Sequence, residues 1–394
     1  MTKAVRAACA ALLVTGTVAV ASPVGAAPVA RVTNGNASGP GSFAEAVAEA
    51  NEKPSIRRIV FDSGLTVVVA GSVEFAGAQA LTVDGNGSTV SGVKVDPAAT
   101  WDGGLFVSEG DSSDLTINDI VFEDSPNNGM AVFVPEDQTG TVNVALRNVV
   151  VDGAQFHGIL VDAQSFDGFN TDDVPHPGCV DPHPFDSDAS VAVSLTNVDV
   201  SGAGSLDPNY DISIATGCPQ DFDGVRVDEG GPGSLSAFVY GGSFDDNLAD
   251  GMELDEVGDG TVSAKVFGAS FNGNGDTVPV DNPAGGVAED LDDGFDIDEA
   301  GPGDLLAQVV NSVVNGNFDE GLDFDEEDEG DVVVTVIGTT ADGNEDEGMK
   351  ADEEDGGDLH FTLVGSSSIN SVSQDGFQVE EQSDGNVVVR VRNS

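Results

Sequence analysis

Short runs of alternating apolar and polar residues recur through the second half of the chain. After Gly260, the sequence TVSAKVFG places Val262, Ala264 and Val266 on one side of an extended backbone. Alternation with a period of two, in short runs bounded by glycine, predicts β-strands. The same pattern recurs as Leu235, Ala237 and Val239; Leu305, Ala307 and Val309; Val332, Val334 and Val336; Leu359, Phe361 and Leu363; and Val387, Val389 and Val391.

A second alternating run precedes each of these strands and is rich in acids. It begins at a glycine that follows an acid, as in GMELDE from Gly251. The aligned glycines are separated by 27, 43, 27, 27 and 28 residues, and the longest interval is one repeat plus an insertion of 16. A fixed period of this length with short strands predicts an all-β solenoid, a parallel β-helix. The glycines are Gly224, Gly251, Gly294, Gly321, Gly348 and Gly376.

Two columns of turn residues support stacked coils. One contains only asparagine and glycine, which tolerate a positive φ at a corner. The other contains only asparagine, whose side-chain amides can bond one another along the axis. The first column is Asn148, Asn197, Gly241, Gly268, Asn311, Gly338, Gly365 and Asn393, and the second is Asn247, Asn274, Asn317 and Asn344.

The open ends of such a solenoid need covers. The segment SFAEAVAEAN is predicted to form a helix over the N-terminal end, with Phe43, Val47 and Ala50 on its apolar face. Ser42 and Glu45 have the spacing of a capping box. The last strand, VVVRVRNS, shows no cap. We therefore expect the C-terminal edge to meet a partner, to form an oligomer, or to be protected from pairing only by the charges of Arg390 and Arg392.

The excess of acidic over basic residues limits the classes of molecule that the protein can bind. The chain has 70 acidic and 13 basic residues and a net charge of −57. Nucleic acid binding is excluded because it needs clustered lysine and arginine residues to displace the counterions of the phosphates. A surface this negative attracts cations or basic partners. The alternative is a solvated acidic surface that keeps the protein soluble.

The N-terminus and the cysteines predict export. Residues 1–26 combine a basic start, an apolar stretch and small residues, the layout of a secretory signal peptide. No later segment is long and apolar enough to span a membrane. The protein is thus expected to be secreted. Cys179 and Cys218, the two cysteines beyond the signal, are expected to form one disulfide in an oxidising compartment.

The start of the mature chain resembles a known superfamily. VTNGNASGPGSFAEAVAEANEKPSIRRIVFD is similar to the opening of secreted right-handed parallel β-helix proteins of the pectate-lyase-like superfamily, with Phe43 and Ala44 in place of the usual Leu-Arg. Together with the repeats, the resemblance predicts one right-handed β-helix domain over 56–394, preceded by a capping segment at 27–55. Insertions are expected near 164–190, 204–222 and 274–291. Activity is not implied, because lyases, epimerases, hydrolases and adhesin-like proteins share this fold.

Stacking would bring the acids into columns. If Met252 and Leu254 face inward, Glu253 and Asp255 face outward, and equivalent carboxylates lie about 4.8 Å apart on neighbouring coils. Such columns repel one another unless cations intervene. Ca²⁺ prefers six to eight oxygen ligands, so we predict calcium along the Asp-Glu turns. The predicted ligands are Asp228, Glu229, Asp255, Glu256, Asp298, Glu299, Asp325, Glu326, Asp352 and Glu353.

The insertions are the other candidate for function, because loops on a regular scaffold carry binding sites. Walls on both sides of Arg226, Asp228, Glu253 and Asp255 would make a ligand groove. The first insertion contains DPHPFD, which is similar to the Asp-Pro-His-Asp element of alginate C5-epimerases, with Pro184 in place of the last Asp. The resemblance makes Asp181 and His183 catalytic candidates. Decorated surface loops without a ligand are the alternative.

These observations predict an exported, calcium-stabilised β-helix that acts as a binding or surface-interaction protein toward carbohydrate or the cell envelope. An extracellular polysaccharide lyase, epimerase or glycoside hydrolase is the alternative. A structural module with no small ligand is a third possibility.

Overall fold

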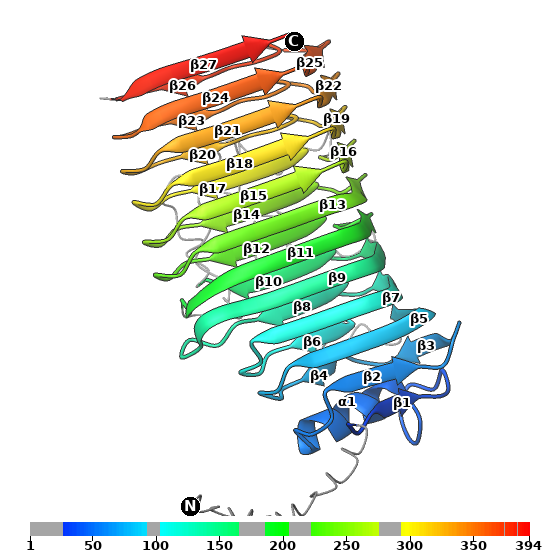
Figure 1. Cartoon of the computed structure of the whole chain (residues 1–394). Helices are drawn as coiled ribbons and strands as arrows, with labels where there is room; N and C mark the ends of the chain where they lie inside the picture. Colours follow the sequence, from blue (N-terminus) through cyan, green and yellow to red (C-terminus); the bar gives the residue numbers. More distant parts are fainter. Residues whose placement is uncertain are drawn as a thin grey trace, which may run out of the picture.

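We describe a computed structural model of the chain over residues 27–92, 103–164, 186–204, 222–275, 293–373, 375–383 and 385–394. The described chain is a right-handed parallel β-helix, as the repeat and the resemblance predict, and it rises as a stack of coils from α1 to β27 (Figure 1). The expected signal peptide, the pair Cys179 and Cys218, the pair Asp181 and His183, and most of each insertion lie outside the described residues.

Two parallel sheets form the wall of the solenoid. The long sheet contains β1 (Ala30–Val32), β2 (Arg58–Phe61), β3 (Thr66–Val69), β5 (Leu81–Gly92), β7 (Asp114–Ser125), β9 (Thr139–Ala154), β11 (Asp188–Ser201), β13 (Leu235–Asp245), β15 (Val262–Phe267), β16 (Ser270–Asn272), β18 (Leu305–Val310), β19 (Val313–Asn315), β21 (Val332–Ile337), β22 (Thr340–Asp342), β24 (Asp358–Val364), β25 (Ser367–Ile369) and β27 (Asn386–Arg392). The short-strand sheet contains β4 (Val73–Phe75), β6 (Phe106–Ser108), β8 (Met130–Phe133), β10 (Ile159–Ala163), β12 (Val225–Glu229), β14 (Met252–Glu256), β17 (Phe295–Glu299), β20 (Asp325–Glu326), β23 (Asp352–Glu353) and β26 (Glu380–Glu381).

The register of these sheets follows the sequence repeat. Val225 pairs with Met252, and Met252 pairs with Phe295 across the longest interval between glycines. Apolar residues at equivalent positions therefore stack inside the solenoid. The ring centroids of Phe244 and Phe271 are 5.1 Å apart, and those of Phe271 and Phe295 are 5.3 Å apart. Full burial of each such side chain contributes about 1.5–3 kcal/mol.

Both predicted turn columns are confirmed. Every member of the asparagine and glycine column has a positive φ, from 50° at Asn148 to 65° at Gly268. The asparagine ladder is buried and continuous. The side-chain oxygen of Asn317 accepts the backbone N–H of Asn274 at 3.1 Å, and the oxygen of Asn344 accepts that of Asn317 at 3.1 Å. Each corner is thus tied to the next coil by its own side chain.

The N-terminal cover is also confirmed. Helix α1 (Phe43–Glu52) begins at Ser42, whose hydroxyl accepts the backbone N–H of Glu45 at 3.2 Å. The Glu45 carboxylate accepts the backbone N–H of Gly41, one residue before the expected capping-box partner. The Phe43 ring lies 5.0 Å from that of Phe61 in the first coil. Strand β1 already pairs with β2, so the sheet begins before the predicted boundary at residue 56.

The last coil is open in the described chain. Strand β27 pairs with β24, and its inward residues Val387, Val389 and Val391 are 45%, 41% and 54% exposed. Oligomerisation through this edge stays a prediction. Helix α1 is the one helix among the described residues, and none there is long and apolar enough to cross a membrane.

The asparagine ladder provides a first test. In Asn317→Ala, the lost side chain leaves the buried backbone N–H of Asn274 without its acceptor. We expect a loss of about 1–3 kcal/mol in the free energy of unfolding, measured by chemical denaturation. Asn36→Ala removes an exposed amide outside the ladder and should change stability by less than about 0.5 kcal/mol. Equal stability of the two variants would show that the ladder contributes little.

Candidate functional site

The outer face of the short-strand sheet carries the acidic columns, and it is less exposed than the sequence indicates. In β14, Met252, Leu254 and Glu256 alternate with Glu253 and Asp255, which point away from the core. Glu253 is only 6% exposed and Asp255 only 2%. A fully solvated acidic surface, the alternative weighed above, therefore does not describe these residues. Buried carboxylates need hydrogen bonds, cations or protons.

One column binds the backbone of the next coil. The acids before Gly224, Gly251 and Gly294 each accept the backbone N–H of the equivalent residue in the following coil. Oδ1 of Asp223 accepts the N–H of Asp250 at 3.1 Å, and Oδ1 of Asp250 accepts that of Asp293. Oδ1 of Asp293 accepts the N–H of Glu320 in turn. Asp223, Asp250 and Asp293 thus each satisfy a backbone donor of the following coil.

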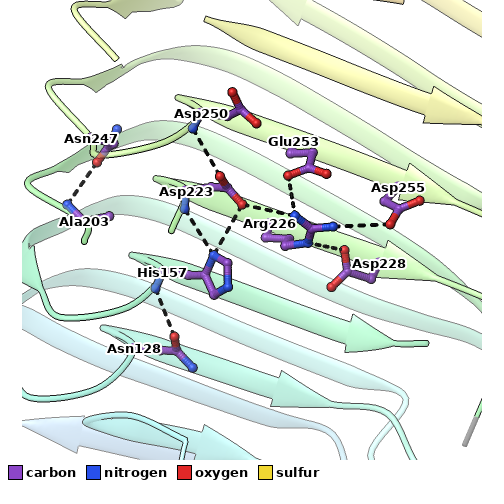
Figure 2. A network of polar contacts seen from close by, with 10 residues as sticks. All are labelled: Asn128, His157, Ala203, Asp223, Arg226, Asp228, Asn247, Asp250, Glu253 and Asp255. Atoms are coloured by element: carbon purple, nitrogen blue, oxygen red, sulfur yellow. Dashed lines mark hydrogen bonds and ion pairs between the residues drawn. The ribbon is translucent and has the colours of Figure 1, made fainter. Parts of the chain in front are cut away.

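His157 extends this column toward the N-terminus. It precedes Gly158, as the acids precede later glycines, and its Nδ1 accepts the N–H of Asp223 at 3.2 Å. The same nitrogen lies 3.3 Å from Oδ2 of Asp223 (Figure 2). An imidazole here can accept from the backbone when neutral or donate to the carboxylate when charged. Sequence reasoning missed His157, although its place before a repeated glycine was a usable signal.

Arg226 lies at the centre of a cluster of four carboxylates. Its guanidinium reaches Asp228 at 2.8 Å, Asp255 at 3.3 Å, Asp223 at 3.6 Å, and Glu253 at hydrogen-bonding distance (Figure 2). Burial raises the pKa of Asp255 to about 7 even though Arg226 lowers it. The four residues predicted to line a groove do lie together, as a network of ion pairs with low exposure.

Lys350 repeats this arrangement further along the solenoid. Its ammonium lies 2.7 Å from Asp323, 3.0 Å from Asp325, 3.9 Å from Glu320 and 4.0 Å from Asp352. Burial and the charge of Asp323 raise the pKa of Glu320 to about 11. A basic side chain therefore lies among four acids at two places on this face, on β12 and just before β23.

The coil between these two clusters contributes acidic side chains to this face and, among its described residues, no basic side chain. Strand β17 contributes Asp296 and Asp298, and Asp293 precedes it. Two groups gather three carboxylate oxygens within 4.8 Å of one another, one around β17 and β14 and one around β17 and the start of the next coil. Further groups of this kind lie beside each basic cluster. The four groups are Glu253, Asp296 and Asp298; Asp293, Asp296 and Asp323; Asp223, Asp250 and Glu253; and Asp319, Glu320 and Asp346.

The glutamates of the Asp-Glu pairs lie on the opposite side of the strand. Glu229, Glu256 and Glu299 follow the alternation of the core residues and are fully buried. Oε1 of Glu229 accepts the N–H of Gly231 at 3.2 Å, whereas its Oε2 has no donor among the described residues. Burial and the neighbouring glutamates raise the pKa of Glu229 to about 8 and that of Glu299 to about 10.

This arrangement differs from the predicted calcium ligands. Strand alternation separates each Asp from the Glu beside it, so an Asp-Glu pair does not offer both carboxylates to one ion. Asp228, Asp255, Asp325 and Asp352 instead contact Arg226 or Lys350. Of the predicted ligands, Asp298 alone belongs to one of the gathered groups of the described chain. The catalytic candidates Asp181 and His183 and the pair Cys179 and Cys218 lie outside the described residues and stay predictions.

Comparison with known proteins gives similarity in fold. No family model matches the sequence, and no curated protein does. Among solved structures, a pectate lyase is 16% identical with a TM-score of 0.48, over 89% of this chain and 80% of that one. The A-module of a mannuronan C-5 epimerase from Azotobacter vinelandii is 13% identical with a TM-score of 0.42, over 84% and 83%. A protein of Geobacillus virus E2 is 12% identical with a TM-score of 0.48, over 91% of this chain but only 61% of the viral one.

The inner glutamates predict how stability depends on pH. Their pKa values, about 8, 10 and 7 for Glu229, Glu299 and Glu326, lie above the usual 4.5. The folded chain therefore holds more protons than the unfolded chain above about pH 4.5. Stability from these groups is complete below that pH and is lost as the pH rises through the raised values. We expect the melting temperature in EDTA to fall between pH 5 and pH 10.

A substitution isolates this effect. Glu299→Gln removes the charge that must be buried at high pH, so its melting temperature should exceed that of the wild type by several degrees at pH 8 and match it near pH 5. The control Glu329→Gln removes an exposed carboxylate and should follow the wild type. A fall with pH that is the same in all three proteins would contradict the role of the inner glutamates.

Proposed function

We propose that the protein is an exported binding or surface-interaction protein whose acidic face binds calcium, with carbohydrate or the cell envelope as its partner. The observation that carries this proposal is the coil at β17, where Asp293, Asp296 and Asp298 gather with acids of adjacent coils between the Arg226 and Lys350 clusters. Export and the carbohydrate partner rest on the signal-like N-terminus and on the resemblance of the opening segment to secreted β-helix proteins.

The geometry favours a hard divalent cation. Two oxygens that each lie about 2.4 Å from one calcium ion are at most about 4.8 Å apart. The gathered carboxylate oxygens meet this limit in groups of three, and backbone carbonyls and water can complete the shell. A bound cation at Asp296 would serve two of these groups. It would offset repulsion on the coil that brings no basic side chain of its own.

The state of the basic residues favours binding over lyase chemistry. A lysine or arginine that acts as a base must lose its proton, and surrounding carboxylates stabilise the protonated form. Arg226 and Lys350 are each held by four carboxylates. We infer that they balance charge in the folded protein.

A polysaccharide-active enzyme is the second candidate, and His157 favours it. This imidazole is partly exposed and contacts Asp223 beside a group of acids. A histidine paired with a carboxylate in this way can transfer a proton in catalysis. In this case the acidic face would bind both the cation and the substrate.

Calcium binding is tested by thermal unfolding of the mature chain at fixed high ionic strength. Excess calcium after EDTA should raise the melting temperature by several degrees and magnesium should raise it less, because binding to the folded state alone stabilises it. Asp296→Asn should reduce the calcium response, and the exposed Asp137→Asn should leave it intact. An equal response to both metals, or none, would contradict a calcium site at β17.

The enzyme candidate has its own test. The mature protein would be incubated with alginate, pectin and neutral glucans in calcium, and the products would be measured by chromatography. Cleavage or epimerisation that is lost in His157→Ala, while the calcium-induced rise in melting temperature is kept, would support catalysis. No product on any of these substrates would favour the binding protein.

A further inference from the structure

Three outward columns of the long sheet lack the acids that are abundant elsewhere in the chain. On β13, Ser236, Phe238 and Tyr240 alternate with buried residues and point outward. None of the residues registered with these three on β11, β15, β18, β21, β24 or β27 is aspartate or glutamate. In a chain with 70 acids, a face of seven strands without a carboxylate in these columns is a distinct surface.

Aromatic rings gather at one place on this face. Phe238 is 41% exposed and Tyr240 is 57% exposed. Phe267 on the adjacent strand β15 is registered with Tyr240, and its ring centroid lies 5.9 Å from that of Phe238. These three side chains, with β13 and β15 side by side in the stack (Figure 1), form what we call the aromatic platform. A patch of neighbouring exposed apolar side chains, unlike a single exposed one, is typical of an interaction surface.

Two basic side chains flank the platform. Lys265 is exposed and registered with Phe238, and Arg147 is exposed and lies two strands from Tyr240, through Thr196. Neither base makes an ion pair with any described residue, although carboxylates are abundant in this chain. Their separation is roughly 15 Å from the strand spacing and rise. Both therefore remain available to an anionic ligand that extends beyond a single sugar.

We propose that the aromatic platform, with Lys265 and Arg147, binds a polysaccharide that carries carboxylate groups. Sugar rings present C–H groups that pack against aromatic faces, and their carboxylates pair with the two bases. This site lies on a different sheet from the acidic face. Its carbohydrate class rests on the proposed function, but it needs no calcium.

Charge and area favour this ligand over the other occupants. The platform offers a few hundred Å² at most from three partly exposed rings, less than the roughly 800 Å² per partner that a stable protein dimer buries. Nucleic acid binding relies on a cluster of several Lys and Arg side chains along the backbone, whereas two basic side chains flank the platform.

The test measures binding of the full mature chain to polygalacturonate and alginate oligosaccharides in EDTA by isothermal titration calorimetry. We expect binding that weakens with salt. Tyr240→Ala and Phe267→Ala should each reduce the affinity at least tenfold. Lys265→Ala should also reduce the affinity, because it removes a partner of the uronate carboxylates. Phe318→Ala, which removes an exposed ring outside the strands, should leave the affinity unchanged. Melting temperatures in calcium should equal that of the wild type in all four variants.

Several outcomes would overturn the proposal: no binding of uronate oligosaccharides at millimolar concentration, binding unaffected by Tyr240→Ala, tighter binding of single-stranded oligodeoxythymidine with the same dependence on Tyr240, or self-association that Tyr240→Ala abolishes. The rise in melting temperature with calcium tests the acidic face independently of the platform. A protein that responds to calcium but binds no uronate in EDTA would keep the proposed calcium site and lose the platform. The reverse result would keep the platform alone.

Discussion

The spacing of neighbouring coils, about 4.8 Å, is the constraint on which the rest of the structure depends. It allows apolar residues at equivalent positions to stack into one core, and it brings every polar residue against its own kind. For Asn317 this stacking is favourable, because an amide both donates and accepts. For Asp255 or Glu299 it is unfavourable, because a carboxylate only accepts. The chain therefore has to provide a partner wherever it repeats an acid.

Three different partners solve this problem at three positions of the coil. The carboxylate of Asp223 accepts a backbone N–H from the next coil. Outward acids on the short-strand sheet contact Arg226 or Lys350, with gathered triplets between them. The inward Glu229 accepts the N–H of a glycine in its own turn and has a raised pKa. Acids that look equivalent in the sequence thus have different physical roles, and a cation suits the second position best.

Much of the fold could be predicted from the sequence because it is local to one repeat. Apolar alternation located the strands, and asparagine or glycine at Asn148 and its equivalents located the corners with positive φ. The burial of the acidic face could not be predicted, because it depends on how the side chain of Arg226 packs against the carboxylates of its own coil and the next. The inward position of Glu229 was available from the alternation of Val225 and Val227, but its place next to a turn obscured it. His157 was missed because its coil lacks the acidic motif.

The dependence of each coil on its immediate neighbours also bears on how the chain folds. Strand pairs in the second half join residues only one repeat apart, so folding can propagate coil by coil. Helix α1 covers the first coils and gives this growth a protected start. Each later coil adds carboxylates to columns already in place, so the electrostatic cost of elongation rises toward the C-terminal half. Ionic strength and acidity should therefore control the rate at which the last coils form more than the rate of the first.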